Sequence, residues 1–182
     1  MNTLRRGAVL LALALGSPPA FAEDVVVRIT RAPDKSYAVE GSFTVNASST
    51  AVWAVLTDYD HIGVFVKAMR HSRTIASRVD GAVIVEQEAV GGSLIFSRAM
   101  RVVLEIRREP GRLTFVDVGR ADFWDYSGSW TVAAEPRGCA VVYHLSASPD
   151  FLVPSFLMRS GMKKGARELL EQIRVEIVKR GA

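Results

Sequence analysis

The chain has 182 residues, of which 49% are hydrophobic and 23% are charged, and its formal net charge is +4. This length suits one domain with a substantial core. The charge is too small for a strongly basic surface, so we expect no nucleic-acid partner. Cys139 is the only cysteine, which excludes an internal disulfide.

The first 22 residues have the pattern of a secretory signal peptide. Arg5 and Arg6 precede a short apolar run, and Ala20-Phe21-Ala22 forms a small-x-small cleavage site. The apolar run is far shorter than the ~20 residues of a membrane-spanning helix. We therefore predict an exported, periplasmic protein that is soluble after cleavage, with a signal peptide at 1–22 and one domain at 23–182. Both arginines leave with the signal, which lowers the net charge of the domain to +2.

Two strands are predicted at the start of the domain, over residues 25–30 and 37–45. The second strand alternates apolar with polar side chains, as strands with one buried face do. A polar break follows, in which Ser48 or Ser49 can act as the N-cap of a short helix over 51–57.

A second short helix is predicted over residues 58–69, with Asp58 or Asp60 as its cap. Asp58, Asp60 and His61 also form the densest group of titratable side chains in the sequence. An acid/base pair is one interpretation of this group, and helix capping is the other.

Turn residues then recur at regular intervals. They are Asp80-Gly81, Gly91-Gly92, Pro110-Gly111, Gly119-Arg120 and Pro136-Arg137-Gly138. Glycine and proline favour hairpin turns, so the spacing predicts an antiparallel meander. Cys139 follows the last turn, at the start of a strand, where it is interpreted as a small filler or as a labile thiol.

Alternation along these strands assigns side chains to the inner face of the sheet. The alternation predicts that two polar side chains, Gln87 and Arg98, point inward among apolar ones and that His144 points outward. The assignments rest on parity alone, so one bulge would reverse several of them. The inner face is expected to carry Val85, Gln87, Arg98, Met100, Val102, Trp124, Tyr126, Trp130 and Tyr143.

A long amphipathic helix is predicted from Pro154 to Arg180. Its apolar stripe includes Met158 and Met162, and Gly161 and Gly165 lie beside the stripe. A glycine inside a helix costs ~1 kcal/mol relative to alanine, so two of them suggest close approach by another group. A neighbouring strand or loop is one candidate, and a bound ligand is the other.

Several segments resemble one known superfamily. They are Ala51-Val52-Trp53-Ala54-Val55-Leu56-Thr57-Asp58-Tyr59-Asp60, Phe123 with Tyr126 and Gly128-Ser129-Trp130, and Val141 with Tyr143 and Pro149. Together they resemble the START-like (SRPBCC) superfamily, and within it the polyketide cyclase/dehydrase and coenzyme Q-binding branch. The resemblance implies an α+β helix-grip fold, in which a curved antiparallel sheet of about 7–8 strands wraps around the C-terminal helix. It also implies a hydrophobic cavity and two short helices after the N-terminal strands.

Members of this superfamily bind lipids, quinones or sterols, or act as cyclases. We expect an exported carrier of a hydrophobic small molecule, with no cofactor, no metal and no catalytic residue assigned. The predicted ligand-binding residues are the nine inner-face residues named above together with Phe65, Met158 and Met162. The predicted cavity entrance consists of Asp58, His61, Phe151 and Phe156.

Two alternatives stay open: a polyketide cyclase or dehydratase, and an envelope protein-interaction module with a filled interior. A basic patch over Arg159, Lys163, Lys164 and Arg167 is either a solvated helix face or a surface for transient contact with anionic lipid headgroups. The pattern leaves the oligomeric state open.

Overall fold

The computed structural model describes residues 24–34, 36–93 and 96–181. The predicted signal peptide lies outside these residues. The strands are β1 (Val26–Arg31), β2 (Tyr37–Val45), β3 (Met69–Ser77), β4 (Val83–Ser93), β5 (Phe96–Glu109), β6 (Arg112–Asp117), β7 (Phe123–Glu135) and β8 (Gly138–Pro149). The helices are α1 (Ser49–Leu56), the 3₁₀ turn η1 (Tyr59–His61), α2 (Ile62–Phe65) and α3 (Ser155–Gly181).

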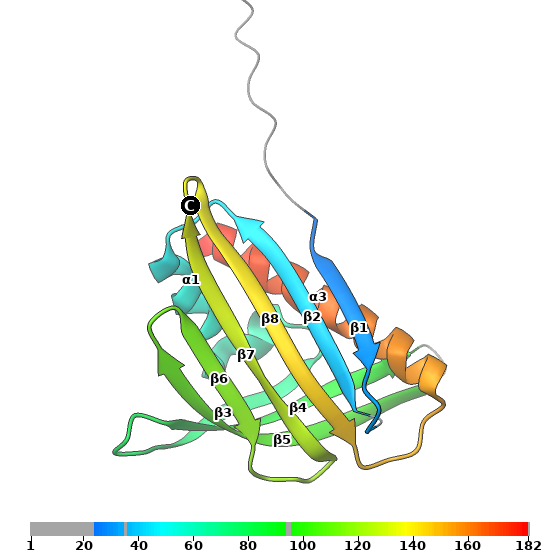
Figure 1. The fold of residues 1–182 in the computed structure, drawn as a ribbon. Helices are drawn as coiled ribbons and strands as arrows, with labels where there is room; N and C mark the ends of the chain where they lie inside the picture. The colour runs from blue at the N-terminus through cyan, green and yellow to red at the C-terminus, as the bar shows by residue number, and fades with distance from the viewer. Residues whose placement is uncertain (1–23, 35, 94–95, 182) are drawn as a thin grey trace, which may run out of the picture.

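The eight strands form one antiparallel sheet in the order β1-β2-β8-β7-β6-β5-β4-β3. Strands β3 to β8 are a meander, and the hairpin of β1 and β2 joins it because β2 pairs with β8. The sheet curves around α3, and the short helices lie near the C-terminal end of α3 (Figure 1). The predicted α+β helix-grip fold is confirmed.

The core lies where the second half of α3 meets the sheet. Leu170, Ile173 and Ile177 of α3 are 0–2% exposed. Gly41 in β2 lets the helix come close, because an added Cβ at this position would collide with the side chain of Leu170. In the part of the chain that the structure describes, no helix is both long and apolar enough to cross a bilayer.

Local signals explain most of the element boundaries. Ser48 caps α1, and its Oγ accepts a hydrogen bond from the backbone N–H of Ala51. Gly81, Gly111 and Gly138 have positive φ, as the predicted hairpin turns require.

Two boundary predictions are wrong. The Gly91-Gly92 pair lies inside β4, where Gly91 pairs with Arg98, and the pairing of β4 with β5 continues to Ser93 and Phe96. Gly91 makes room for the terminal methyl of Met100 on the next strand, which an added Cβ would meet. The second helix ends at Phe65 because Val66 is extended, and the chain enters β3 at Met69.

Cys139 fills a buried position at the start of β8. Its side chain is 3% exposed, and its Sγ donates to the carbonyl of Ala47. Burial raises the pKa of the thiol, so the filler interpretation is confirmed.

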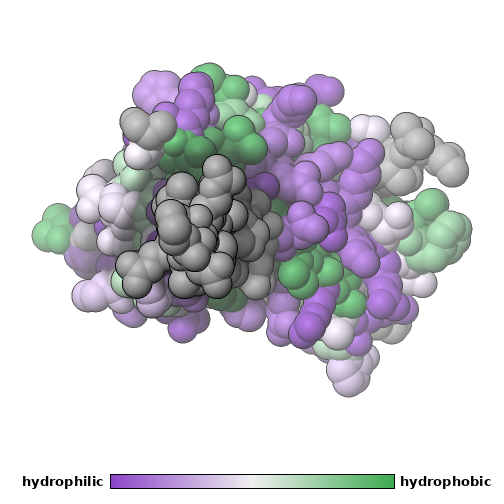
Figure 2. Space-filling model, turned by 90° about the horizontal axis from the view of Figure 1, so that it is seen from above, coloured by the Kyte–Doolittle hydropathy of each residue, from purple (hydrophilic) through white to green (hydrophobic). Residues whose placement is uncertain are grey.

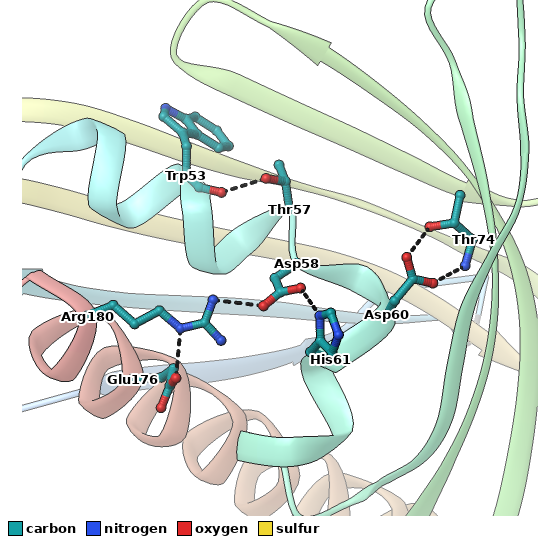
Figure 3. A network of polar contacts seen from close by, with 8 residues as sticks. All are labelled: Trp53, Thr57, Asp58, Asp60, His61, Thr74, Glu176 and Arg180. Carbon is teal, nitrogen blue, oxygen red and sulfur yellow. Dashed lines mark hydrogen bonds and ion pairs between the residues drawn. The ribbon is translucent and has the colours of Figure 1, made fainter.

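Ion pairs hold the C-terminal end of α3 against η1 (Figure 3). Arg180 donates from Nη1 to Asp58 and from Nε to Glu176, both at 2.7 Å. The other oxygen of Asp58 lies 2.7 Å from Nδ1 of His61, and Asp60 accepts hydrogen bonds from the backbone N–H and the hydroxyl of Thr74 on β3. Asp58 and Asp60 therefore connect separate elements, and neither caps a helix with its side chain.

These contacts also change the pKa values of the acids. Burial raises the pKa of Asp58, but the hydrogen bonds from His61 and Arg180 outweigh it and the net shift is downward. The hydrogen bond from Arg180 likewise lowers the pKa of Glu176. A lowered folded-state pKa stabilises the fold above the unfolded value, and this stabilisation is lost as the pH falls through the folded value.

Replacing Arg180 by glutamine should lower the free energy of unfolding by about 1 kcal/mol at pH 7, since two partly screened carboxylates lose their shared cation. Urea titrations at neutral pH and at about pH 3 should show that this difference shrinks in acid, because the stabilisation is lost as the pH falls toward the lowered pKa values of Asp58 and Glu176. Lys179→Gln is the control, because Lys179 is 73% exposed and contacts Glu176 only at 3.4 Å. An equal loss at both pH values in Arg180→Gln would contradict the electrostatic explanation.

Candidate ligand-binding cavity

A cavity of about 230 Å³ lies between the first half of α3 and the inner face of the sheet, and it is partly open to solvent. Its walls come from α3, from the ends of β4, β5, β7 and β8 that face this part of the helix, and from the segments 66–69 and 151–157. Small-molecule sites typically enclose ~300–1,000 Å³. The cavity therefore suits a small or slender ligand.

The sheet side of the cavity is an aromatic wall. Phe123, Tyr126 and Tyr143 line the cavity, and the rings of Phe123 and Tyr126 are 4.8 Å apart. Trp130 packs behind them, with its ring 4.5 Å from that of Tyr143. This tilted packing holds the lining rings in place, so the wall is a rigid apolar surface.

The helix side of the cavity contains both glycines that the sequence singled out. Gly161 and Gly165 line it together with Met158 and Met162. A Cβ added at Gly165 would meet nothing within 4 Å. Among the described residues, no strand or loop approaches Gly165, which is itself exposed. Of the two candidates, a bound ligand is the one that fits this position in the cavity lining.

Tyr126 and Tyr143 bring two hydroxyl groups to this apolar wall. Burial raises the pKa of both, that of Tyr143 well above its usual value, and a hydrogen bond between the two side chains raises it further while lowering that of Tyr126. Two hydroxyls that bond to each other use only one of their two protons. The pair therefore keeps one O–H that can donate to a ligand oxygen.

The cavity meets solvent at Arg98, which lines it and whose side chain is 43% exposed. Nη2 of Arg98 donates to Oδ1 of Asp122 at 2.6 Å. The guanidinium carbon lies 4.4 Å from the centroid of the Phe151 ring, which itself makes an edge contact with Phe123. Arg98, Asp122 and Phe151 thus join β5, the β6–β7 connection and the segment after β8, and we call these three residues the cavity mouth.

The sequence model of one family, described as polyketide cyclase / dehydrase and lipid transport, matches residues 36–177. The chain belongs to this family. The match covers strands β2 to β8 and most of α3, and β1 lies outside it. It therefore includes all the walls of the cavity. No curated protein matches the chain closely.

Solved structures with the same fold include lipid-transfer proteins and a cyclase. A STAR-related lipid transfer protein fragment from Xanthomonas axonopodis is 16% identical, with 84% of this chain and 98% of that one covered and a TM-score of 0.62. The Zhui aromatase/cyclase of a Streptomyces species is 13% identical, with 80% and 95% covered and a TM-score of 0.67. Human StAR-related lipid transfer protein 5 is 11% identical, with 89% and 88% covered and a TM-score of 0.68. At these identities the likeness shows the START-like fold alone.

In this family member, seven of the predicted site residues line the cavity. They are Arg98, Met100, Tyr126, Tyr143, Phe151, Met158 and Met162. Strand parity placed the four strand residues, the helical stripe placed Met158 and Met162, and Phe151 was predicted as part of the entrance loop before the helix. Their contact with a ligand stays a prediction.

Other predicted lining residues face inward but lie outside the cavity. Val85 and Val102 are packed in the core, as is Trp130 behind the aromatic wall. Gln87 donates to the hydroxyl of Ser72 on β3, and the ring of Phe65 lies under the guanidinium of Arg180 at 5.2 Å. Their side chains pack in the core or join neighbouring elements, and the cavity lies beyond them.

The inward orientation predicted for Trp124 is wrong, because its side chain is 70% exposed. The pairing of β7 with β8 shifts register between Phe123 and Asp125. This irregularity turns Phe123 into the core, at 6% exposure, and turns Trp124 out.

The structure does not bring the four predicted entrance residues together. Phe151 lies at the cavity mouth, whereas Phe156 is 70% exposed and is not among the described residues of the cavity lining. Asp58 and His61 lie with Arg180 at the other end of α3, outside the cavity lining. They lie at one end of α3 and the cavity lies at the other. The sequence around Asp58 and His61 carries no signal of which end of the helix they contact.

Sequence reasoning missed the segment 66–69 as a cavity wall, together with the helix residue Gln172 that holds it. The amide oxygen of Gln172 accepts a hydrogen bond from the backbone N–H of Lys67 at 2.7 Å. No periodic pattern signals a contact across 105 positions. Leu145 and Ala147, by contrast, share the parity of Tyr143 and could have been found.

Replacing Gly165 by alanine should raise the free energy of unfolding by up to about 1 kcal/mol, because the added methyl improves helix propensity and meets open space. Gly41→Ala is the matched control and should destabilise, since its methyl collides with Leu170. Urea titration of both variants measures the two changes. A loss of stability in Gly165→Ala would mean that protein atoms occupy this part of the cavity.

Proposed function

We propose that the protein binds a hydrophobic small molecule, such as a lipid, a quinone or a polycyclic compound, in the cavity beside α3 and carries it. The partly open, apolar cavity between the first half of α3 and the aromatic wall of the sheet is the observation that carries this proposal. No described atom lies within 4 Å of a Cβ built on Gly165, so this glycine reduces helix stability and has no packing role toward the described residues. A ligand that occupies the space gives the glycine a function.

Burial supplies the affinity in this proposal. Covering roughly 200 Å² of apolar ligand surface contributes about 5 kcal/mol at ~25 cal/mol per Å². The spare hydroxyl of the Tyr126–Tyr143 pair and the guanidinium of Arg98 then orient the ligand, as a few polar groups do in most apolar sites. A rigid aromatic wall reduces the ordering that binding requires.

The cyclase alternative requires a group in the cavity that can abstract a proton. Tyr126 and Tyr143 have raised pKa values and are protonated at neutral pH, so they can donate a proton but are poor bases. Glu168, the carboxylate among the described lining residues, is half exposed and has Lys164 3.8 Å away, so it is not enclosed with a bound molecule as a catalytic base would be. The other alternative, a protein-interaction module with a filled interior, does not fit the cavity. A carrier is the function that uses the features of the site.

The signal-peptide pattern supports export as part of the same proposal. Residues 1–22 carry the arginine pair, the apolar run and the cleavage site, so we place the domain in the periplasm. A periplasmic carrier would collect or deliver a hydrophobic molecule at a membrane.

A surface beside the cavity mouth supports transient contact with anionic lipids. Leu152 is fully exposed, and Trp124 and Phe156 are each 70% exposed. Hydrophobic side chains gather at the end of the molecule where α3 begins (Figure 2). Exposed apolar groups beside cations are the composition of a membrane-contacting surface.

The basic patch adds less charge to this surface than its four cations suggest. Lys164 and Arg167 each lie 3.8 Å from an acid one turn further along α3. Arg159 reaches the carbonyl of Ile29 on β1. The apolar side chains therefore provide most of the membrane affinity in the proposal, and the cations favour anionic lipids over neutral ones.

Native mass spectrometry of the protein, produced from its full-length coding sequence and purified from the cell envelope, tests the carrier proposal. We expect a stoichiometric hydrophobic ligand that organic extraction releases. Gly165→Leu should lose this ligand, because its side chain fills the cavity. Ser160→Leu is the control, since it adds the same bulk to an exposed position of α3 outside the cavity.

Retention of the ligand by Gly165→Leu would show that it binds elsewhere. A wild-type protein that carries no ligand, and that binds none of a panel of lipids and quinones, would contradict the carrier proposal.

The membrane proposal is tested by sedimentation with phosphatidylglycerol vesicles. The double change Leu152→Ser and Phe156→Ser should weaken binding about tenfold, because two apolar side chains no longer enter the interface. Val79→Ser is the matched control, since Val79 is fully exposed on the β3–β4 turn, away from the cavity. Equal weakening in the control, or equal binding to phosphatidylcholine vesicles, would argue against this surface.

A further inference from the structure

The walls of the cavity carry very little charge. Among its described lining residues, Arg98 and Glu168 are the charged ones. Glu168 lies on α3, is half exposed, and has Lys164 of the same helix 3.8 Å away. Arg98 is therefore the cation that a ligand meets on the sheet side, next to a wall of aromatic and aliphatic groups.

The environment of Arg98 orients its guanidinium. The Phe151 ring covers the guanidinium at 4.4 Å, and Nη2 donates to Asp122. A guanidinium has five N–H donors arranged in a planar fork. The hydrogen bond to Asp122 uses one of them, so the fork has the capacity to bind a further oxyanion in its plane.

Asp122 does not depend on Arg98 alone. Its second oxygen accepts a hydrogen bond from the backbone N–H of Arg101 at 2.8 Å. Burial raises the pKa of Asp122, but the bonds from Arg101 and Arg98 outweigh it and the net shift is downward. Asp122 would thus remain held by the backbone if Arg98 turned to another anion. Breaking the Arg98–Asp122 ion pair would cost little stability, because the Arg98 side chain is 43% exposed and ion pairs that water reaches contribute little.

We propose that the ligand is an amphiphile with a single anionic head group, and that Arg98 binds this head group at the cavity mouth. This inference rests on the proposed carrier function. The apolar tail lies along Met158 and Met162 on one side and the aromatic wall on the other. The head group takes the place of Asp122 as partner of the guanidinium, and Phe151 keeps the guanidinium plane in position for a two-point contact.

The test compares three probes with the same twelve-carbon tail: dodecanoic acid, dodecyl phosphate and dodecanol. Displacement of a fluorescent lipid analogue from the full-length protein measures their binding. Both anionic probes should bind at least about tenfold more tightly than the alcohol, because each makes a charge-assisted hydrogen bond that the alcohol does not. The ratio of the two anions distinguishes a carboxylate from a phosphate head group.

Arg98→Gln should abolish this preference and leave the binding of dodecanol unchanged. Arg101→Gln is the matched control: Arg101 lies on the same strand, is 73% exposed, and pairs with Glu88 outside the cavity lining. Its substitution removes one positive charge and keeps the backbone N–H that holds Asp122, so the preference should persist. Asp122→Asn should strengthen binding of the anions, because Arg98 loses its competing carboxylate.

The outcomes separate this inference from the function on which it rests. Equal affinity for dodecanol and for the anions, or an unchanged preference in Arg98→Gln, would overturn the anionic head group and leave the carrier proposal intact. Weaker anion binding in Asp122→Asn would overturn the proposal that the head group replaces Asp122 as the partner of Arg98. This result would count even if Arg98→Gln failed to fold. Failure of all three probes to bind would count against the carrier function itself.

Discussion

The structure depends on how α3 rests on the sheet. The second half of the helix is in full contact, with Leu170, Ile173 and Ile177 buried and Gly41 allowing close approach. The first half carries glycines and methionines in place of buried branched residues, and the cavity lies between it and the inner face of the sheet. One helix therefore serves as a core element at one end and a cavity wall at the other. The ion pairs around Arg180 secure the packed end, so the position of the open end is fixed without filling it.

The chemistry of the cavity follows from this arrangement. Its aromatic wall is supported by the neighbouring ring of Trp130. Its polar groups are few: the paired hydroxyls of Tyr126 and Tyr143, the guanidinium of Arg98, and Glu168 and Gln172 of α3. Such a site holds and orients a mostly apolar molecule. Lipid-transfer proteins and an aromatase/cyclase share the fold. The fold supplies the space, and the placement of the few polar side chains decides between carrying a ligand and transforming it.

Periodic features of the sequence were sufficient for the fold and for part of the cavity lining. The strand period placed Met100 and Tyr143, and the helical period placed Met158 and Met162. The bulge beside Trp124 was not visible, because a one-residue irregularity leaves the composition of a strand unchanged. Contacts between distant positions, such as Asp58 with Arg180 or Lys67 with Gln172, have no local signal either. The space beside the first half of α3 was predicted in part. The two glycines of the helix indicated close approach by another group, but they did not show whether that group is a strand, a loop or a ligand.

The hydrogen bonds between Asp60 and Thr74 have a consequence for association between molecules. β3 is an edge of the sheet, and an unpaired edge strand offers its N–H groups to the strands of other molecules. The carboxylate of Asp60 occupies the N–H of Thr74, and the ladder of β3 with β4 is irregular between Thr74 and Ala76. A strand from a second molecule would meet a charged side chain and a bent backbone at this edge. The exposed end of a long sheet is in this way protected from edge-to-edge aggregation.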